Sequence, residues 1–279
     1  MSQPMRVLIT GSNGQLGRAL LARLPGAARA SRPAVDITQL ESVYAAVEAA
    51  QPEVILHCAA MTDVDGAARD PALAYRVNGL GTQNVALAAA RVGAALAYLS
   101  TNEVFDGAKR EPYSEFDSPR PINPYGKSKL AGEWFAVHLT QRFYIIRTAW
   151  LSGAGGRNFI HRIQQLADER GHLRVVTDEI ANPTFVEDLA GAIVTLIGTG
   201  RFGIYHLTNA GYCSRYDYAR KILELTGRRH VPVEPVTRAQ FSRPSTPPEF
   251  SALANTAAAA LGITLRPWEE ALREFLSVK

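Results

Sequence analysis

Tyr125 and Lys129 stand four residues apart in the stretch Pro124-Tyr125-Gly126-Lys127-Ser128-Lys129. On a helix this spacing puts both side chains on one face. A free tyrosine has a pKa of about 10, too high for proton transfer near neutral pH, and a neighbouring ammonium lowers it. The pair therefore predicts that Tyr125 gives a proton to a carbonyl oxygen while hydride arrives at the carbon. Lys129 would tune that hydroxyl and hold the ribose of a nicotinamide cofactor.

Thr101 follows a short apolar run that is typical of a buried strand. In an open α/β sheet, ligands bind at the carboxyl ends of the strands. A hydroxyl there could hold the substrate carbonyl oxygen together with Tyr125. Alone, Thr101 would be read as a strand-end cap, and Y-x-x-x-K alone is a weak signal. Taken with the glycine turn described next, they predict the catalytic set Thr101, Tyr125 and Lys129.

The first apolar run leads directly into Gly11-Ser12-Asn13-Gly14-Gln15-Leu16-Gly17, a G-x-x-G-x-x-G pattern. Glycines in this context allow a tight turn, close approach of the backbone to a pyrophosphate, and close packing of helix on strand. The helix that follows offers free N–H groups to the phosphates. The turn predicts a dinucleotide site whose cofactor-binding residues are Gly11, Asn13, Gly14, Gln15, Leu16 and Gly17.

The cofactor is NADPH or NADH, and the sequence leaves the choice open. Asp36 lies 19 residues after Gly17, near the distance at which an acidic residue binds the adenosine ribose and favours NAD. The second strand is poorly defined, so Asp36 also fits a helix-start residue before Thr38. Arg29 and Arg32 are close by and could accept the 2′-phosphate of NADP.

The fold predicted is α/β, a Rossmann-like doubly wound parallel sheet with a smaller C-terminal substrate lobe. Continuous apolar runs are typical of parallel strands covered on both faces. The runs are Arg6–Thr10, Val54–His57, Leu96–Ser100, Tyr144–Thr148, Leu173–Val176 and Ile204–Leu207. Residues 1–150 are expected to form the cofactor domain, with segments near 173–177 and 186–207 completing the sheet. The substrate lobe would then comprise 151–172, 178–185 and 208–279.

Start signals place several helices between these strands. Thr38 with Glu41 resembles a capping box before a helix that ends near Ala50. Asp70 followed by Pro71 predicts a helix that runs to about Val92. In the last third, Ser214 with Asp217 is another capping pattern, residues 231–250 are Pro-rich and irregular, and a final helix is expected from about Trp268 to Leu276.

Composition argues against several classes of protein. The chain has 279 residues, 47% of them hydrophobic, and a net charge of +4 from scattered rather than clustered basic residues, so we expect no nucleic-acid partner. No apolar run is long enough for a membrane helix, and no secretory signal is expected where the first strand and glycine turn begin. Cys58 and Cys213 form no disulfide framework, and six histidines without clustered carboxylates predict no metal site. A cytoplasmic location is expected.

Together these residues resemble the extended short-chain dehydrogenases, and within them the dTDP-4-dehydrorhamnose reductase family. The further matching stretches are Asp36-Ile37-Thr38, Cys58 to Asp65, Val77-Asn78, Gly81-Thr82, Arg147-Thr148-Ala149-Trp150, Asn182-Pro183-Thr184, Gly203 to Thr208, Arg243-Pro244, Leu261-Gly262-Ile263 and Pro267-Trp268. The resemblance implies hydride transfer from NADPH or NADH to the C4 keto group of a dTDP-linked 6-deoxyhexose. It implies that Asp36, Ile37, Ala59, Ala60 and Thr62 line the cofactor, and that the nucleotide sugar lies near Trp150, Asn158 and the 182–184 turn.

One stretch departs from the family pattern. Where the family has S-T-D-Y-V-F-D-G, this chain has Ser100-Thr101-Asn102-Glu103-Val104-Phe105-Asp106-Gly107. Glu103 could bind a different sugar hydroxyl pattern, could point away and bridge to a basic neighbour, or could mark lost activity, as in relatives that serve as regulatory subunits of methionine adenosyltransferase. The substrate-binding residues implied are Thr101, Asn102, Glu103, Val104, Trp150 and Asn158.

Two rival classes and one partner remain open. A nucleotide-sugar epimerase would retain its cofactor and show no net redox change, and a cofactor-binding partner protein would show no turnover. Trp134 and Phe135 on the Tyr125 helix fit either the core or a subunit contact, so a homodimer is an option.

Overall fold

The computed structural model describes residues 4–155 and 158–277. The outer bounds expected for the two lobes, residues 1 and 279, lie outside the described residues. Among those described, no helix combines the length and apolar character that a membrane span requires.

A six-stranded parallel sheet forms the centre of the molecule, in the order β10-β5-β4-β3-β1-β2. Its strands are β1 (Val7–Thr10), β2 (Ala28–Ala30), β3 (Val54–His57), β4 (Ala95–Thr101), β5 (Phe143–Thr148) and β10 (Gly203–His206). β1 and β3 are buried along their whole length. This burial explains their continuous apolar runs and confirms the predicted doubly wound α/β class.

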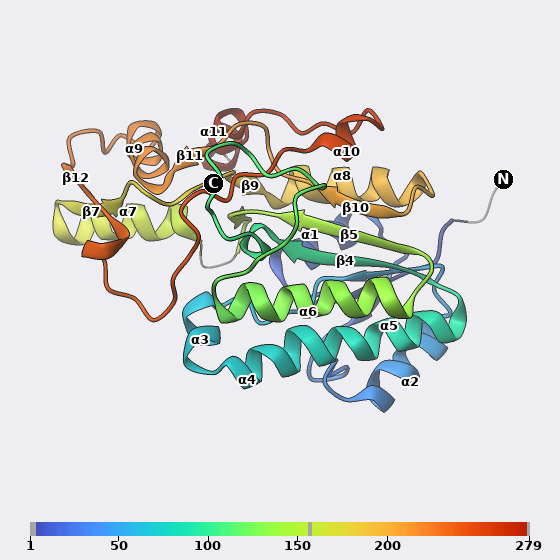
Figure 1. Ribbon diagram of the computed structural model, residues 1–279. Coiled ribbons are helices and arrows are strands. Elements are labelled where there is room, and N and C mark those ends of the chain that lie inside the picture. Colours follow the sequence, from blue (N-terminus) through green and yellow to red (C-terminus); the bar gives the residue numbers. More distant parts are fainter. Residues whose placement is uncertain (1–3, 156–157, 278–279) are drawn as a thin grey trace.

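Helices cover both faces of the sheet (Figure 1). One face carries α1 (Gln15–Arg23), α8 (Val186–Gly198) and α10 (Thr256–Ala259), and the other carries α2 (Leu40–Ala50), α5 (Gly81–Val92) and α6 (Pro124–Leu139). Each face buries its own apolar cluster, the first around Ile9, Leu20 and Leu189 and the second around Ile55, Val85 and Leu96. The sheet is therefore fixed from both sides, and its carboxyl edge is left to carry the site.

The connection after β3 is helical almost throughout. It comprises α3 (Val64–Arg69), α4 (Pro71–Ala74) and η1 (Tyr75–Leu80), a π-helical segment that leads into α5. Asp70 accepts from the Leu73 amide at 2.9 Å, so the start predicted at Asp70 and Pro71 is confirmed. The capping box at Thr38 is wrong, because α2 begins at Leu40 and Thr38 instead donates to Asp36.

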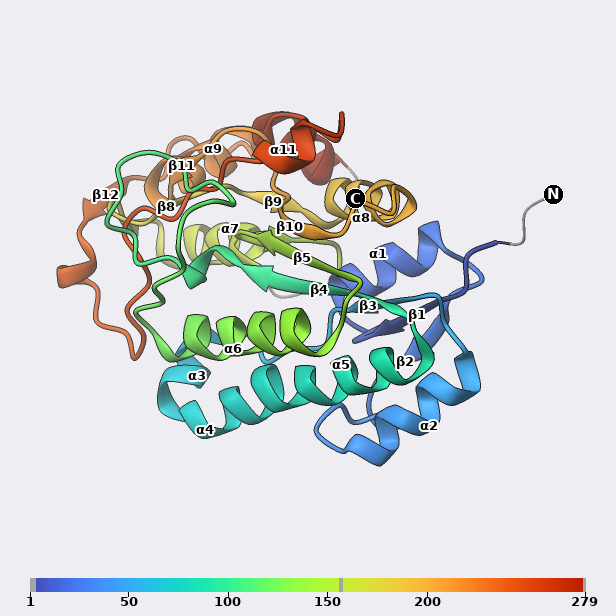
Figure 2. The same ribbon diagram turned by 45° about the vertical axis from the view of Figure 1, so that its right-hand side comes forward.

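The smaller lobe has its own apolar core, around Ile163, Tyr218 and Trp268. Its elements are β6 (Leu151–Ser152), α7 (Phe159–Arg170), β7 (Leu173–Val176), β8 (Ile180–Ala181), β9 (Thr184–Phe185), β11 (Cys213–Ser214), α9 (Arg215–Leu225), β12 (Val233–Val236), η3 (Arg238–Gln240) and α11 (Trp268–Ser277). Figure 2 shows this lobe beyond the carboxyl ends of β4 and β5. The capping pattern at Ser214 is confirmed, since its hydroxyl accepts from the Asp217 amide at 3.0 Å.

β7 corrects the expected sheet. Residues 173–177 were expected to join the central sheet, but β7 pairs in parallel with β12 in a separate two-stranded sheet. β10 pairs with β5 instead. The partner of β7 comes from the Pro-rich stretch that looked irregular, so its pairing could not be seen in local sequence.

Candidate active site

The glycine turn forms a cradle that side chains would fill. Gly11 has φ +67°, and a Cβ there would lie 2.6 Å from the Ala59 nitrogen. A Cβ on Gly17 would lie 2.3 Å from the Gly11 oxygen. Gly14 caps α1 without a side chain, so the first N–H groups of the helix remain available to an anion. Among the described atoms, the buried Gln15 Oε1 has no hydrogen-bond partner.

These features fit a dinucleotide. The turn has the shape that a pyrophosphate requires, and Leu16 packs into the core beneath it. Asn13 stays exposed, with its amide 3.2 Å from the Ser31 hydroxyl.

The loop after β3 lies against the same turn. Ala59 contacts the Gly11 position, Ala60 is partly exposed, and Thr62 is exposed. Asn78 belongs to a stretch that matches the family in sequence but for which the sequence predicts no role. Its side chain holds this loop, because it accepts from the Met61 amide at 2.8 Å and donates to the Ser128 hydroxyl at 2.9 Å. It thereby ties the loop to the helix of Tyr125.

The carboxyl end of β2 carries Ser31 rather than an acid. The Ser31 hydroxyl lies 2.8 Å from the Ser12 hydroxyl, at the edge of the glycine turn. Asp36 lies beyond the strand, where Oδ1 accepts from the Thr38 amide and hydroxyl at 2.9 and 2.8 Å. These bonds lower the pKa of Asp36, and Arg32 contributes in the same direction. Ile37, expected beside the cofactor, is buried against Gly81.

Tyr125 is the second residue of α6. Pro124 opens the helix, and Asn123 caps it by accepting from the Gly126 amide at 2.8 Å. Burial and the carboxylate of Glu103 raise the pKa of Tyr125, while a hydrogen bond with Thr101 lowers it. Thr101 ends β4 opposite Thr148 of β5, so strand and helix bring the two hydroxyls together as predicted.

Lys129 lies one turn further along α6 and is 3% exposed. Its ammonium donates to the Leu99 carbonyl at 2.7 Å and lies 4.2 Å from the centre of the Tyr98 ring. Burial lowers the pKa of Lys129 to about 7. Lys129 is not among the groups that shift the pKa of Tyr125 in this arrangement, where burial and Glu103 raise it instead of the lysine lowering it.

Several residues expected to bind substrate serve the protein itself. Val104 is fully buried beside Phe105 and Leu253, so its side chain cannot reach a ligand. The Asn102 amide donates to the Ser251 hydroxyl at 2.7 Å. The Asn158 side chain accepts from the His161 amide at 3.0 Å and so caps the start of α7.

Trp150 lies where the two lobes meet. It has φ +38°, and the Arg215 guanidinium lies 3.6 Å from the centre of its ring. Asn182 is buried and donates to the Gly211 carbonyl at 2.8 Å, so it supports the turn next to Trp150 rather than lining an opening.

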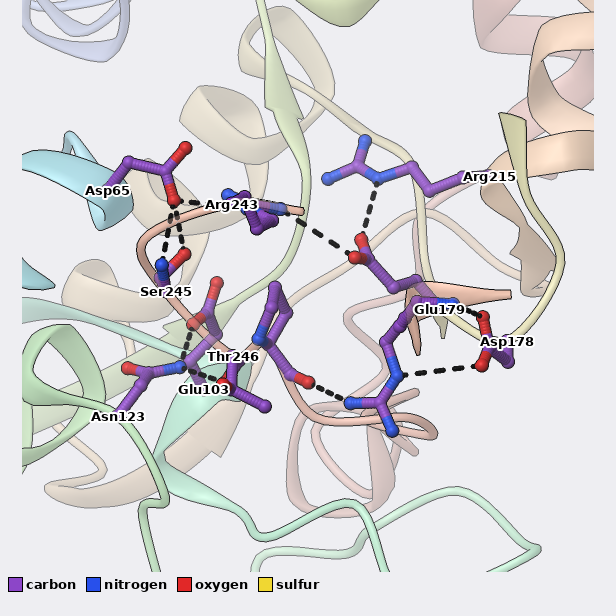
Figure 3. Close-up of polar contacts among 11 residues, drawn as sticks. Asp65, Glu103, Asn123, Asp178, Glu179, Arg215, Arg243, Ser245 and Thr246 are labelled. Carbon is purple, nitrogen blue, oxygen red and sulfur yellow. Dashed lines mark hydrogen bonds and ion pairs between the residues drawn. The ribbon is translucent and has the colours of Figure 1, made fainter. Parts of the chain in front are cut away.

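Glu103 lies among a group of charged residues that no motif in the sequence predicts to come together (Figure 3). Its Oε2 accepts from the Asn123 amide nitrogen at 2.6 Å. Glu179 lies between Arg215 and Arg243, at 3.8 and 3.6 Å. One alternative from the sequence had Glu103 bridging to a basic neighbour. The partner of its carboxylate is instead the neutral side chain of Asn123.

Arg243 also links this group to the cofactor side. Its Nε donates to Asp65 at 3.0 Å, and Ser245 donates to the same carboxylate through its amide and its hydroxyl. The segment from Arg243 to Ser245 therefore crosses between the lobes, bound to Asp65 on one side and to Glu179 on the other.

A pocket of about 560 Å³ opens next to these arginines. It is lined by Phe159, Arg162, Ile163, Leu166, Arg170, His172, Leu173, Arg174, Val175, Val176, Glu179, Arg215, Phe241 and Arg243. Aromatic, apolar and basic groups together suit a planar base attached to an anionic chain.

Comparison with known proteins identifies the family. The model of the RmlD substrate binding domain matches residues 5–279. The chain belongs to this family. A dTDP-4-dehydrorhamnose reductase of Mycobacterium tuberculosis is 39% identical over 284 residues, covering 98% of this chain and 92% of that one. The spore coat polysaccharide biosynthesis protein SpsK of Bacillus subtilis is 38% identical over 275 residues, covering 97% and 96%. The structure of a dTDP-4-dehydrorhamnose reductase of Bacillus anthracis in complex with NADP has 40% identity and a TM-score of 0.94, covering 98% and 99%.

Proposed function

We propose that this RmlD-family chain is an NAD(P)H-dependent oxidoreductase that reduces the 4-keto group of a dTDP-linked 6-deoxyhexose. The substrate proposed is dTDP-4-dehydro-L-rhamnose and the product dTDP-L-rhamnose. One observation carries the proposal: the Tyr125 and Thr101 hydroxyls meet at the carboxyl edge of the sheet, with Lys129 one turn away along α6. The glycine cradle lies at the same edge, after β1, which β3 separates from β4. The relatives' reductase names agree with it.

NADPH or NADH, when bound, supplies hydride to the carbonyl carbon. Gly11, Gly14 and Gly17 would hold its pyrophosphate, with Asn13, Gln15 and the backbone of Leu16 at the helix start. Ala59, Ala60 and Thr62 would line the nicotinamide half, and the segment of Asp36 and Ile37, beyond the end of β2, would border the adenosine end. Lys129 uses one donor on Leu99, and its other two are free to hold the ribose.

Tyr125 donates its proton to the carbonyl oxygen, and Thr101 holds that oxygen in line with the tyrosine. Burial and Glu103 raise the pKa of Tyr125, so its hydroxyl carries the proton before the reaction. The positive charge that the cofactor gains as it gives up hydride would lower this pKa and favour proton release. Arg215 and Arg243 would face the diphosphate, because both line the pocket and both act electrostatically on the Glu103 carboxylate. Trp150 would border the sugar.

Residues 1–150 with about 186–207 would form the cofactor lobe, and α10 (Thr256–Ala259) packs on the same sheet. Most of the remaining residues would form the substrate lobe. A homodimer would form through the outer faces of α5 and α6, where Trp134 is 55% exposed beside the ring of His138. We place the protein in the cytoplasm, where its two free thiols, Cys58 and Cys213, would stay reduced.

The test is oxidation of NADPH and NADH, followed by absorbance, with dTDP-4-dehydro-L-rhamnose generated in situ. Wild-type turnover that falls at least about 100-fold in Tyr125→Phe supports the reductase. Product formed without net cofactor oxidation would point to an epimerase. Tight cofactor binding without turnover of any nucleotide keto-sugar would overturn the proposal and favour a partner protein.

A further inference from the structure

Glu103 makes contact with the start of the catalytic helix from two directions. Its carbonyl oxygen packs against Gly126, where a Cβ would lie 2.1 Å away. Its side-chain Oε2 accepts from Asn123 Nδ2 at 2.6 Å. Both contacts fall on residues next to Tyr125 or two positions before it.

Asn123 is the joint of this arrangement. Its Oδ1 accepts from the Gly126 amide at 2.8 Å, and its backbone carbonyl accepts from the Lys127 amide at 3.0 Å. Its Nδ2 donates to Glu103 and also to the Thr246 carbonyl at 3.2 Å. The orientation of the Asn123 side chain therefore determines whether the first turn of α6 is capped. Of the two bonds that its Nδ2 donates, the one to Glu103 is shorter than the one to Thr246.

The carboxylate suits this task because it offers a charged acceptor to a neutral amide, and such bonds are stronger than neutral ones. Figure 3 shows one carboxylate oxygen on Asn123 and the other turned away from it. Burial raises the pKa of Glu103, and the Asn123 bond lowers it, as does Arg243. A tyrosine hydroxyl at this position would offer Asn123 only a neutral acceptor.

Thr101 is bound to the same element. Its hydroxyl accepts from the Glu103 amide at 3.2 Å. The backbone of Glu103 thus holds one of the two hydroxyls that converge on the carbonyl oxygen, and its side chain holds the helix that carries the other.

We propose that Glu103 is a positioning residue that acts through Asn123 to hold the first turn of α6, and with it the Tyr125 hydroxyl, at the reaction centre. The role of Tyr125 rests on the proposed function, whereas the hold on the helix does not. Loss of the carboxylate should release the first turn of α6 and lower kcat far more than it changes the KM for NADPH. The glycine cradle lies on another element, and Lys129, one turn further along α6, keeps its own bond to Leu99 of β4.

The test combines Glu103→Gln, Glu103→Ala, Asn123→Ala and the double variant Glu103→Ala/Asn123→Ala. Glu103→Gln keeps an acceptor for Asn123 and should retain kcat within about threefold, whereas Glu103→Ala should lower it about 10- to 100-fold. In the Asn123→Ala background, Glu103→Ala should add no further loss, which is the signature of one shared path. Additive losses, or Glu103→Gln as poor as Glu103→Ala, would overturn the proposal.

Hydrogen exchange of the peptide that covers residues 124–130, measured on the same proteins with NADPH present, supplies a readout that does not depend on turnover. Glu103→Ala should speed exchange in this peptide, and Glu103→Gln should restore it. Exchange as in the wild type for Glu103→Ala overturns the proposal even if the reductase is active. The expected exchange pattern in a wild type that reduces no keto-sugar would sink the proposed function and leave the positioning role standing.

Discussion

Lys129 donates to the carbonyl oxygen of Leu99 at 2.7 Å, so the lysine of the catalytic helix is anchored to β4. The Tyr98 ring, on the same strand, lies beneath the ammonium. The strand that ends in Thr101 therefore also fixes Lys129, and one strand sets the position of two members of the catalytic set. An ammonium with one donor occupied still has two to offer a ribose.

Burial of Lys129 makes the stability of the protein depend on pH. Its folded pKa of about 7 lies below the ordinary lysine value of 10.5. Between these values the unfolded chain binds more protons, so stability rises with pH across this interval. The cost of burying the charge is complete below the folded pKa. Lys129→Met should therefore raise the unfolding temperature by about 2 °C or more at about pH 6, and by less at about pH 9.

Thermal unfolding of both proteins at the two pH values tests this, with reductase activity measured in parallel. The variant should be more stable and yet at least about 100-fold less active. A variant that is less stable at the lower pH, or shifted equally at both, would show that the bonds to β4 outweigh the buried charge.

Cofactor choice should depend on Arg32. This residue follows Ser31, whose hydroxyl touches the glycine turn, and a basic side chain at the end of β2 can accept a 2′-phosphate. Arg32→Ala should raise the KM for NADPH about tenfold and change that for NADH less than about twofold. Steady-state kinetics with both cofactors measure this. Arg29→Ala, at an exposed arginine within β2, is the control, and a larger effect there would assign the phosphate to Arg29.

The glycine turn and the start of α6 could be predicted because local sterics decide them. Gly11 adopts a positive φ, and Pro124 opens a helix that Asn123 caps. The ribose end could not be predicted, since β2 has only three residues and no continuous apolar run. The spacing of Asp36 from the glycine turn therefore suggested a ribose-binding acid, although β2 ends at Ala30, six residues earlier.

Side-chain direction was the other limit of sequence reasoning. Val104 and Asn158 stand at plausible positions, but tertiary packing turns one into the core and makes the other a helix cap. The link between Glu103 and Asn123 joins residues 20 positions apart. Asn123 could have been noticed as a cap before Pro124, but its second bond depends on how β4 meets α6.

The buried ion pair of Glu133 and Arg147 should contribute strongly to the free energy of unfolding, because it ties α6 to β5. Their side chains are 5% and 2% exposed, and they pair through two bonds, of 2.7 and 3.0 Å. Glu133→Ala leaves the Arg147 charge buried and unpaired, and should lower the free energy of unfolding by about 3–5 kcal/mol. Denaturant unfolding of the two proteins measures the difference.

Glu48→Ala offers the matched control, because Glu48 pairs with Arg91 at the surface, where the side chains are 47% and 57% exposed. Its cost should stay below about 1 kcal/mol. Equal losses in the two variants would mean that burial does not set the strength of the inner pair.

The glycine cradle should be intolerant of a single methyl group at Gly17. A Cβ there would lie 2.3 Å from the Gly11 oxygen and 2.7 Å from the Ser12 Cα, both backbone atoms that cannot move aside cheaply. Gly17→Ala should push α1 away from the turn and weaken NADPH binding at least about tenfold, because the phosphates need the helix start close to the strand. Gly26→Ala, where a Cβ would meet nothing within 4 Å, should bind NADPH like the wild type. Fluorescence titration with NADPH compares the three proteins, and unchanged affinity in Gly17→Ala would remove the pyrophosphate from this turn.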